Sequence, residues 1–542
     1  MKTIKSLVLG SAAGLLAMGG AQAADLPVKA KAVEYVKVCS LYGAGFFYIP
    51  GTDTCIKIGG ALRIESFYNA GISSSMAYSG DLGQQNRYRD YFDSRSRMVL
   101  NVDTRTATEY GVVRTFGQTS ITFDTLGGSS TNPATTGPGG LAGGTAGTAN
   151  LANTPGGGFT TADFIFIQFA GFTFGKSASA FATPWHGFPG NNTAFLLGGH
   201  DTVNGTNNIQ YTAQFGNGVS ATIGLDESVV HNRTAVINAG FAANATVTFV
   251  ATGTAFNGAG LSAYAGQYAP DIVGNIRVDQ AWGLFQISAA AHQVNASYNI
   301  LGAGSAPTAL SEISGHPDSK WGGAVMAALQ IKNLPTGAGD DLKIDATYAK
   351  GDTKQVISTA STSPSFAMFS GTTRAGAYQS FGFGQTTDAI FLPVLAGPAG
   401  IGGGDGQLKL TESYGIRGAF NHNWDPYWST SVWGSAAAVR YNGTVGDLTT
   451  AKGIYCANYT TGKVLSADYV CNPDFNTYQL GMTTRWTPVK NLTFSAEVGW
   501  FRLDQRMQGA ATLTPTAPKP TATYEYKDQD TVYLNLRAQR NF

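Results

Sequence analysis

The segment from Asp530 to Phe542 alternates apolar and polar side chains at every second position. A period of two is the signature of a β-strand whose two faces meet different surroundings. In a soluble sheet the apolar face would cover a core, whereas in a membrane barrel it would meet lipid while the polar face meets water. The length of this strand and its aromatic final residue favour the barrel. Its apolar face carries Val532, Leu534, Leu536, Ala538 and Phe542.

Composition narrows the choice further. Only 13% of the 542 residues are charged and 43% are hydrophobic, so the chain is not of the disordered class. We find no run of about 18 uninterrupted apolar residues, the minimum for a helical membrane span. The chain is therefore expected either to be soluble or to cross a bilayer as strands.

Residues 1–23 have the pattern of a secretory signal peptide. Lys2 and Lys5 precede an apolar run from Leu7 to Met18, and the small-residue pattern Ala21-Gln22-Ala23 follows. Removal of this leader takes two of the 35 basic residues, leaving 33 against 34 acidic residues and a net charge of −1. This balance does not indicate a nucleic-acid partner.

The four cysteines fall into two local pairs, Cys39 with Cys55 and Cys456 with Cys471. In an exported chain this grouping predicts two disulfide bonds. Zinc is the alternative, but neither pair has C-x-x-C spacing or a neighbouring histidine pair. We expect no metal and no cofactor.

Period-two alternation recurs through the chain after a lead-in at residues 24–54. It predicts sixteen strands within residues 55–542: 55–69, 94–105, 109–125, 162–169, 172–178, 206–215, 219–229, 272–280, 283–294, 321–332, 341–350, 408–421, 428–441, 475–487, 491–503 and 530–542.

Short and long connections alternate between these strands. The connection after 162–169 is Ala170-Gly171, for example, whereas the connection after 219–229 runs from Val230 to Asp271. Tight turns at one end and long loops at the other are typical of an antiparallel membrane barrel. The prediction is an all-β, 16-stranded antiparallel transmembrane β-barrel. Its first and last strands must pair, since an open edge in hydrocarbon would leave unpaired amides.

Several stretches resemble the general porins of alphaproteobacteria. They are Val38 to Cys55, Arg95 to Gly111, Phe166 to Gly175 and Tyr533 to Arg537. The resemblance runs through most of the chain. It implies a homotrimer in the bacterial outer membrane, in contact with the lipid bilayer and lipopolysaccharide. It also implies that the third external loop folds into the lumen and sets the bore.

On the predicted strands this third loop is Ser179 to Gly205. It contains Trp185, Phe188, Phe195, Leu196, Leu197 and a single acid, Asp201. A loop against the inner wall could bury these large side chains, whereas an extended surface loop would rarely expose so many. The alternative is an ordinary external loop with a small hydrophobic cluster.

Basic residues on the facing wall are candidates for the constriction. Inward placement avoids the cost of a charge in lipid, about 2–4 kcal/mol at midplane. Each of these residues could instead lie at the rim, in water or against lipopolysaccharide phosphates. With Asp201 they form the predicted constriction: Arg63, Arg95, Arg97, Arg105, Arg114 and Lys176.

These features predict a weakly selective general porin that passes small hydrophilic solutes and ions, with an anion preference because wall bases outnumber the loop acid. A sugar-specific channel with an aromatic track is the alternative, and Phe67, Phe501 and Tyr533 have inward parity. A siderophore receptor would need a plug of ~100 residues before the barrel, which is longer than the lead-in at residues 24–54. An enzyme is not expected, since H-E-x-x-H and G-x-S-x-G are absent.

Overall fold

The computed structural model describes residues 37–71, 75–76, 85–87, 91–125, 157–193, 203–228, 233–240, 262–302, 306–357, 366–395, 402–515 and 519–542. The predicted leader and residues 24–36 of the lead-in lie outside this part of the chain. So does most of the Gly-rich connection before residue 157.

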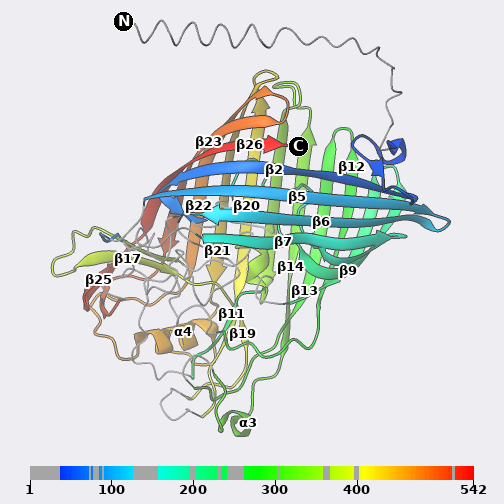
Figure 1. Cartoon of the computed structure of the whole chain (residues 1–542). Helices are drawn as coiled ribbons and strands as arrows, with labels where there is room; N and C mark the ends of the chain where they lie inside the picture. The colour runs from blue at the N-terminus through cyan, green and yellow to red at the C-terminus, as the bar shows by residue number, and fades with distance from the viewer. Residues whose placement is uncertain are drawn as a thin grey trace, which may run out of the picture.

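Sixteen long antiparallel strands of the described chain form a closed barrel, seen side by side in the upper part of Figure 1. Each coincides with one of the strands predicted from the sequence, so the fold prediction is confirmed. They are β2 (Thr54–Tyr68), β5 (Phe92–Thr108), β6 (Gly111–Asp124), β7 (Gly157–Phe169), β8 (Phe172–Ser177), β9 (Thr206–Gly216), β10 (Val219–Asp226), β12 (Asp271–Gln280), β13 (Gly283–Val294), β14 (Lys320–Lys332), β15 (Asp341–Lys350), β20 (Glu412–Asn423), β21 (Trp428–Arg440), β22 (Phe475–Val489), β23 (Leu492–Gln505) and β26 (Gln529–Asn541).

The barrel closes where β2 pairs antiparallel with β26, in register from Ala61 opposite Asn541 to Tyr68 opposite Leu534. The backbone pairing extends to Phe542, whose N–H donates to the carbonyl oxygen of Gly60 at 3.0 Å and whose carbonyl accepts from the Gly60 N–H at 3.1 Å. The seam therefore leaves no open edge between these strands, which is what a bilayer requires.

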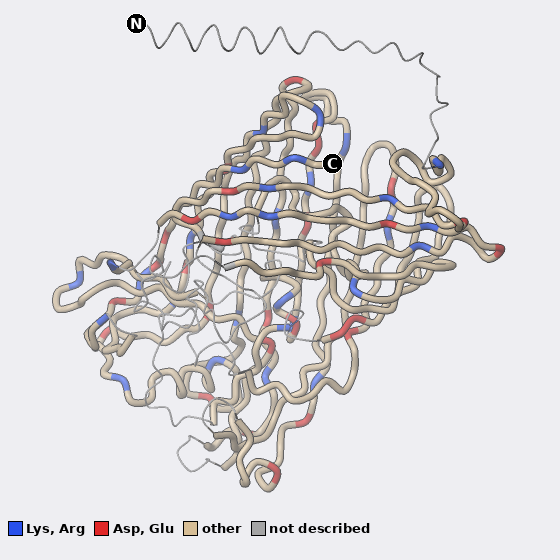
Figure 2. Tube along the Cα trace, viewed as in Figure 1, with Lys and Arg blue, Asp and Glu red and all other residues tan. Residues whose placement is uncertain are grey.

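The two faces of the wall differ as the alternation predicted. Apolar side chains such as Ile58, Ile165 and Ile276 are exposed on the outside, while charged and amide side chains face inward. Basic and acidic residues are interspersed along the barrel strands (Figure 2). The wall thus presents hydrocarbon to the outside and hydrogen-bonding groups to the lumen.

Tight turns join the strands at one end of the barrel, which we call the short-turn end. Ala170 and Gly171 have φ of 49° and 85°, and Asn217 and Gly218 have φ of 49° and 73°. Two successive positive φ angles define the hairpin turn whose twist matches that of the flanking strands, and Gly and Asn adopt them readily. The opposite end, where the long connections lie, is the long-loop end.

The described lead-in forms a small lobe at the short-turn end, coloured dark blue in Figure 1. It contains η1 (Ser40–Tyr42) and β1 (Phe47–Tyr48), and β1 pairs with the start of β2. The predicted disulfide bond between Cys39 and Cys55 is present. It ties this lobe to the first barrel strand.

The long connections build a second, larger lobe at the long-loop end. It contains two small sheets and α4 (Ala451–Thr460). The sequence interpretation treated these segments as loops, except for residues 409–410, which it included in the predicted strand 408–421. One sheet is formed by β16 (Phe366–Ser370), β17 (Gln379–Gly384), β25 (Ala522–Tyr526) and β24 (Ala510–Leu513). The other is formed by β11 (Ala235–Asn238), β18 (Thr387–Phe391) and β19 (Lys409–Leu410). The remaining short elements are β3 (Ala70–Gly71), β4 (Ser75–Met76), α3 (Ser311–Ser314) and η5 (Thr353–Gln355).

An aromatic core holds this lobe together and continues into the barrel mouth. Tyr455 and Tyr459 of α4 are buried against Tyr441, Phe383 and Tyr526. Aromatic pairs of this kind stabilise a core beyond their buried area. No helix of the described chain is both long and apolar enough to span a membrane.

The second predicted disulfide bond, between Cys456 and Cys471, joins α4 to the segment that leads into β22. Its sequence separation is 15 residues, for which the lost loop entropy corresponds to about 3 kcal/mol. We expect the double variant Cys456→Ser/Cys471→Ser to be cleaved faster by protease in this lobe while its barrel keeps its heat-dependent gel mobility. Unchanged cleavage would contradict a stabilising role for this bond.

Candidate pore constriction

The described part of the predicted constriction loop runs through the inside of the barrel. Asn275 of β12 donates to the carbonyl oxygen of Ala180 at 2.6 Å. Gln286 of β13 does the same to Ala182 at 2.7 Å. On the other side Asn421 of β20 donates to the Pro189 carbonyl at 3.1 Å. Residues 179–193 therefore contact inward side chains of several strands, unlike an ordinary surface loop.

Of the large side chains that the sequence analysis named in this segment, Trp185 is buried and Phe188 is half-buried at the cavity. Phe181 and Trp185 are both buried inside the barrel. The remaining part of the loop, residues 194–202, lies outside the described chain. The predicted loop residues Phe195, Leu196, Leu197 and Asp201 are within it, so the position of the predicted loop acid is not described.

Glu497 of β23 is the main anchor for the far end of this segment. Its carboxylate accepts hydrogen bonds from the Asn192 N–H at 2.5 Å and the Thr193 hydroxyl at 2.6 Å. The hydroxyls of Thr483 and Tyr533 donate to the same group at 2.7 and 2.8 Å. Glu497 is fully buried, so these four donors replace the water that an ionised carboxylate requires.

Arg485 of β22 adds a second attachment. Its guanidinium donates to the Asn192 side-chain oxygen and to the Gly190 carbonyl. At Gly190 the backbone approaches the wall so closely that a Cβ atom would lie 2.5 Å from the Cβ of Ala419. Glycine is needed at this position because any larger residue would push the segment off the wall.

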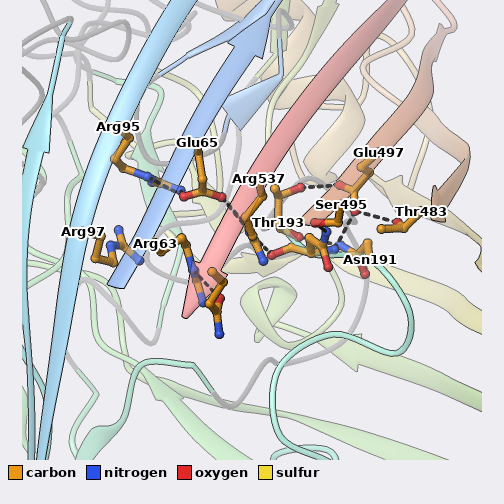
Figure 3. Close-up of polar contacts among 12 residues, drawn as sticks. Arg63, Glu65, Arg95, Arg97, Asn191, Thr193, Thr483, Ser495, Glu497 and Arg537 are labelled. Atoms are coloured by element: carbon orange, nitrogen blue, oxygen red, sulfur yellow. Dashed lines mark hydrogen bonds and ion pairs between the residues drawn. The ribbon is translucent and has the colours of Figure 1, made fainter. Parts of the chain in front are cut away.

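Across the seam lies a buried ionic group, shown in Figure 3. Glu65 of β2 accepts from Arg95 of β5 at 2.6 Å and from Arg537 of β26 at 2.7 Å. Arg537 also donates to the Asn192 carbonyl of the loop segment. One carboxylate thus holds two arginines on neighbouring strands, and one of these arginines reaches the loop.

Arg63 of β2 and Arg97 of β5 lie beside this group and are register partners on the two neighbouring strands. Arg63 Nε donates to Gln539 at 2.9 Å, and Arg97 Nε donates to Thr122 at 3.0 Å. Within the described part of the chain neither guanidinium forms an ion pair with a carboxylate. Figure 3 shows both side chains on their neighbouring strands, and both line the cavity described next.

A cavity of about 740 Å³ separates this arginine wall from the loop segment. Its wall side includes Arg63, Arg95, Arg97 and Arg537, and its loop side includes His186 to Phe188 and Asn191 to Thr193. Most of the other lining groups are polar or amide side chains. The described loop segment and the arginine wall therefore lie on opposite sides of this cavity.

Arg105 and Arg114 lie closer to the short-turn end. Both donate to Asp103, at 3.1 and 3.0 Å. The Arg105 guanidinium also lies 4.9 Å from the ring centre of Phe46 in the lead-in lobe. Asp103 lines the cavity, and these two arginines form a separate cluster next to it.

The inward placement of Lys176 is corrected by the structure. In β8 this residue has the same parity as Phe172 and Phe174, whose side chains are exposed on the barrel exterior, and it pairs in register with the exposed Ile165. It is not among the residues that line the cavity. The ammonium group of Lys176 donates to the backbone carbonyl of Asp163 at 2.9 Å. The flexible aliphatic part of the side chain allows the charged group to reach this polar partner.

Several residues of this site were not selected from the sequence, among them Glu65, Asp163, Arg485, Glu497 and Arg537. The polar parity of their strands was visible and places them inside the barrel. Alternation gives the face of the sheet on which a residue lies. It does not give the height of the residue along the barrel axis or the residue that it contacts on another strand, and both decide which polar residues meet the loop.

The fold and this site together define the class, a transmembrane β-barrel channel whose lumen is narrowed by an inserted loop. Family comparison then identifies the chain as a member of the porin subfamily, whose model matches residues 25–535. Family and barrel place it in the bacterial outer membrane.

Individual relatives agree with this membership, and a solved structure has the same fold. Porin Omp2b of Brucella suis is 34% identical over 286 residues, which cover 52% of this chain and 64% of that protein. Porin Omp2b of Brucella abortus (strain 2308) is 33% identical over 285 residues, or 52% and 63%. These matches span less than two thirds of each relative. The outer membrane channel DcaP of Acinetobacter baumannii has the same fold, with a TM-score of 0.52, 12% identity, and coverage of 91% of this chain and 99% of that one.

Proposed function

We propose that the protein is a general porin, through which small hydrophilic solutes and ions diffuse passively down their gradients. The observation that carries this proposal is the hydrogen-bonded attachment of residues 179–193 to the inner wall, which leaves a polar passage of about 740 Å³ beside it. A polar lumen of fixed bore sorts solutes by size and charge without any chemical step. The passage would be the constriction, and the arginines together with Asp201 would shape its field.

Size sieving would distinguish this function from a sugar-specific channel. Phe67, Phe501 and Tyr533 are all buried in the wall, so they do not offer an open aromatic track. We expect liposome swelling rates to fall smoothly with the size of the sugar and to show no saturation. A rate that saturates with one sugar while similar sugars pass freely would contradict the general-porin proposal.

Ion preference follows from the charges around the passage. Within the described chain, the cavity and the loop anchors beside it contain the arginines Arg63, Arg95, Arg97, Arg485 and Arg537 and the carboxylates of Glu65, Asp163 and Glu497, a net charge of +2. Lys57 and Asp103 also line the cavity, and their opposite charges leave this difference unchanged. We expect the reversal potential of single channels in a potassium chloride gradient to show a preference for anions. Glu412→Gln, at an exposed ion pair with Lys350, is the control and should keep the wild-type potential. A cation preference of the wild-type channel would refute the anion lean.

The surroundings of the channel are also part of the proposal. Family membership and the apolar outer face support a homotrimer in the outer membrane, with lipid and lipopolysaccharide around it. Residues 1–23 would act as the removed leader, and the lobe after them would precede the barrel. Light scattering of the detergent-purified protein tests the trimer, and a monomeric mass would contradict it.

A further inference from the structure

Two arginines in the passage differ from their neighbours in how their charge is balanced. Arg95 and Arg537 share the carboxylate of Glu65, and Arg485 is bound to polar groups of the loop segment close to Glu497. Arg63 and Arg97 are opposed in register, and each uses Nε on a neutral side chain. Their terminal N–H groups have no carboxylate acceptor within the described residues. Two neighbouring guanidinium groups held at a cavity wall can donate their terminal N–H groups to an anion in the lumen.

An acid that lines the same cavity does not pair with these two arginines. Asp163 lines the same cavity, and its carboxylate accepts from the hydroxyls of Ser120 and Thr161, at 2.5 and 3.1 Å, and from Gln118 at 3.3 Å. It forms no ion pair with either arginine within 4.0 Å, although it reduces the total to the net +2 given above. A small anion of charge −2 would neutralise this net charge of the described arginines and carboxylates.

We propose that Arg63 and Arg97 form a saturable binding site for small dianionic oxyanions, of which inorganic hydrogenphosphate is the simplest. This inference rests on the proposed channel function and names the ligand class of that passage. One guanidinium can donate two parallel hydrogen bonds to a tetrahedral or planar oxyanion, and two opposed guanidinium groups can hold the same anion between them. Gln539 and Asn101, which also line the cavity, supply further donors to an anion there.

Binding would change how the channel conducts. A dianion held in the passage occupies the path that chloride uses, so it should interrupt the chloride current until it leaves. The block should saturate with concentration, because the site is one pair of side chains. Simple exclusion by a diffuse positive field would instead vary smoothly with ionic strength.

The test is a titration of inorganic phosphate against chloride current through single wild-type channels in a planar bilayer. We expect saturable block by phosphate, sulfate and succinate at similar concentrations, and a need for much higher concentrations of acetate. Arg63→Gln and Arg97→Gln should each raise the half-blocking phosphate concentration about tenfold or more, because a charge-assisted hydrogen-bonding partner is removed. Arg502→Gln removes an exposed arginine that is paired with Asp528, and this control channel should have the wild-type half-blocking phosphate concentration.

The outcomes separate this inference from the function on which it rests. A wild-type channel that passes chloride without saturable phosphate block overturns the oxyanion site and leaves the porin function intact. The absence of any ion conductance in correctly folded wild-type protein overturns the function itself. Equal block of the wild type and both cavity variants shows that another site binds the anion, and it also overturns the assignment.

Discussion

Glu497→Ala is expected to enlarge the passage and make its conductance unstable, the largest functional effect of a single substitution that we anticipate. The change removes the acceptor for Asn192, Thr193, Thr483 and Tyr533. Each buried donor left without a partner costs about 1–3 kcal/mol, so the loop segment should leave the wall for part of the time. Single-channel recordings should show higher mean conductance and more open-channel noise, and larger sugars should enter liposomes.

Two comparisons make this result specific to the loop anchor. Glu497→Gln retains an acceptor oxygen of the same shape and should show a smaller increase in noise. Glu412→Gln removes a carboxylate from an exposed pair outside this contact and should behave as the wild type. Wild-type conductance, noise and sugar exclusion in the alanine variant would show that Glu497 does not hold the segment in place.

The second large effect concerns stability in the bilayer. Ile276 lies in the middle of β12, is 61% exposed on the outer face and pairs with Ile287 of β13. Replacement by arginine would put a charge against hydrocarbon, at a cost of about 2–4 kcal/mol near midplane. Urea titrations of folding into lipid vesicles, read by heat-dependent gel mobility, should show Ile276→Arg unfolding at clearly lower urea.

Ile276→Val is the matched control, because it keeps a branched apolar side chain on the same face. It should unfold close to the wild-type urea concentration. If the arginine variant unfolds with the valine variant, this face of β12 does not contact hydrocarbon, and the orientation of the barrel wall would have to be reconsidered.

The barrel strands could be predicted because their signal is local. The face of the sheet on which Ile58 or Arg63 lies can be inferred from the adjacent residues alone. Tight turns such as Ala170-Gly171 mark the ends of the strands. The two disulfide bonds were equally accessible, since each pair of cysteines is close in sequence. These features need no knowledge of distant partners, and all of them are present in the structure.

The site was only partly predictable, because its contacts join residues far apart in sequence. Glu65 and Arg537 are separated by 472 residues, and Thr193 and Glu497 by 304. Alternation places the strand residues Glu65, Glu497 and Arg537 on the lumen side, but it says nothing of which pairs meet and does not apply to Thr193 in the loop. The strands β16 to β18 and the helix α4 were missed because they are buried against other long connections in an aromatic core. They do not lie in the barrel wall, where one face meets lipid and the other meets the lumen.

Lys176 was assigned wrongly for a different reason. The alternation of β8 groups it with Phe172 and Phe174, and the expectation that a charged residue must face inward was given more weight than this parity. A lysine near a strand end can satisfy its charge by reaching along the surface, here to the Asp163 carbonyl. Charge alone is therefore a weaker guide to direction than the strand pattern.

The pairing of β2 with β26 also constrains how the molecule is made. Arg63 and Gln539, which meet at this junction, are 476 residues apart, so a ribosome has released most of the polypeptide before the cylinder can be completed. Contacts between residues so far apart in sequence form slowly. Until they form, the incomplete sheet has unpaired edge strands that promote aggregation. Completion of the cylinder is therefore the step that removes the last unpaired strand edges from the folding chain.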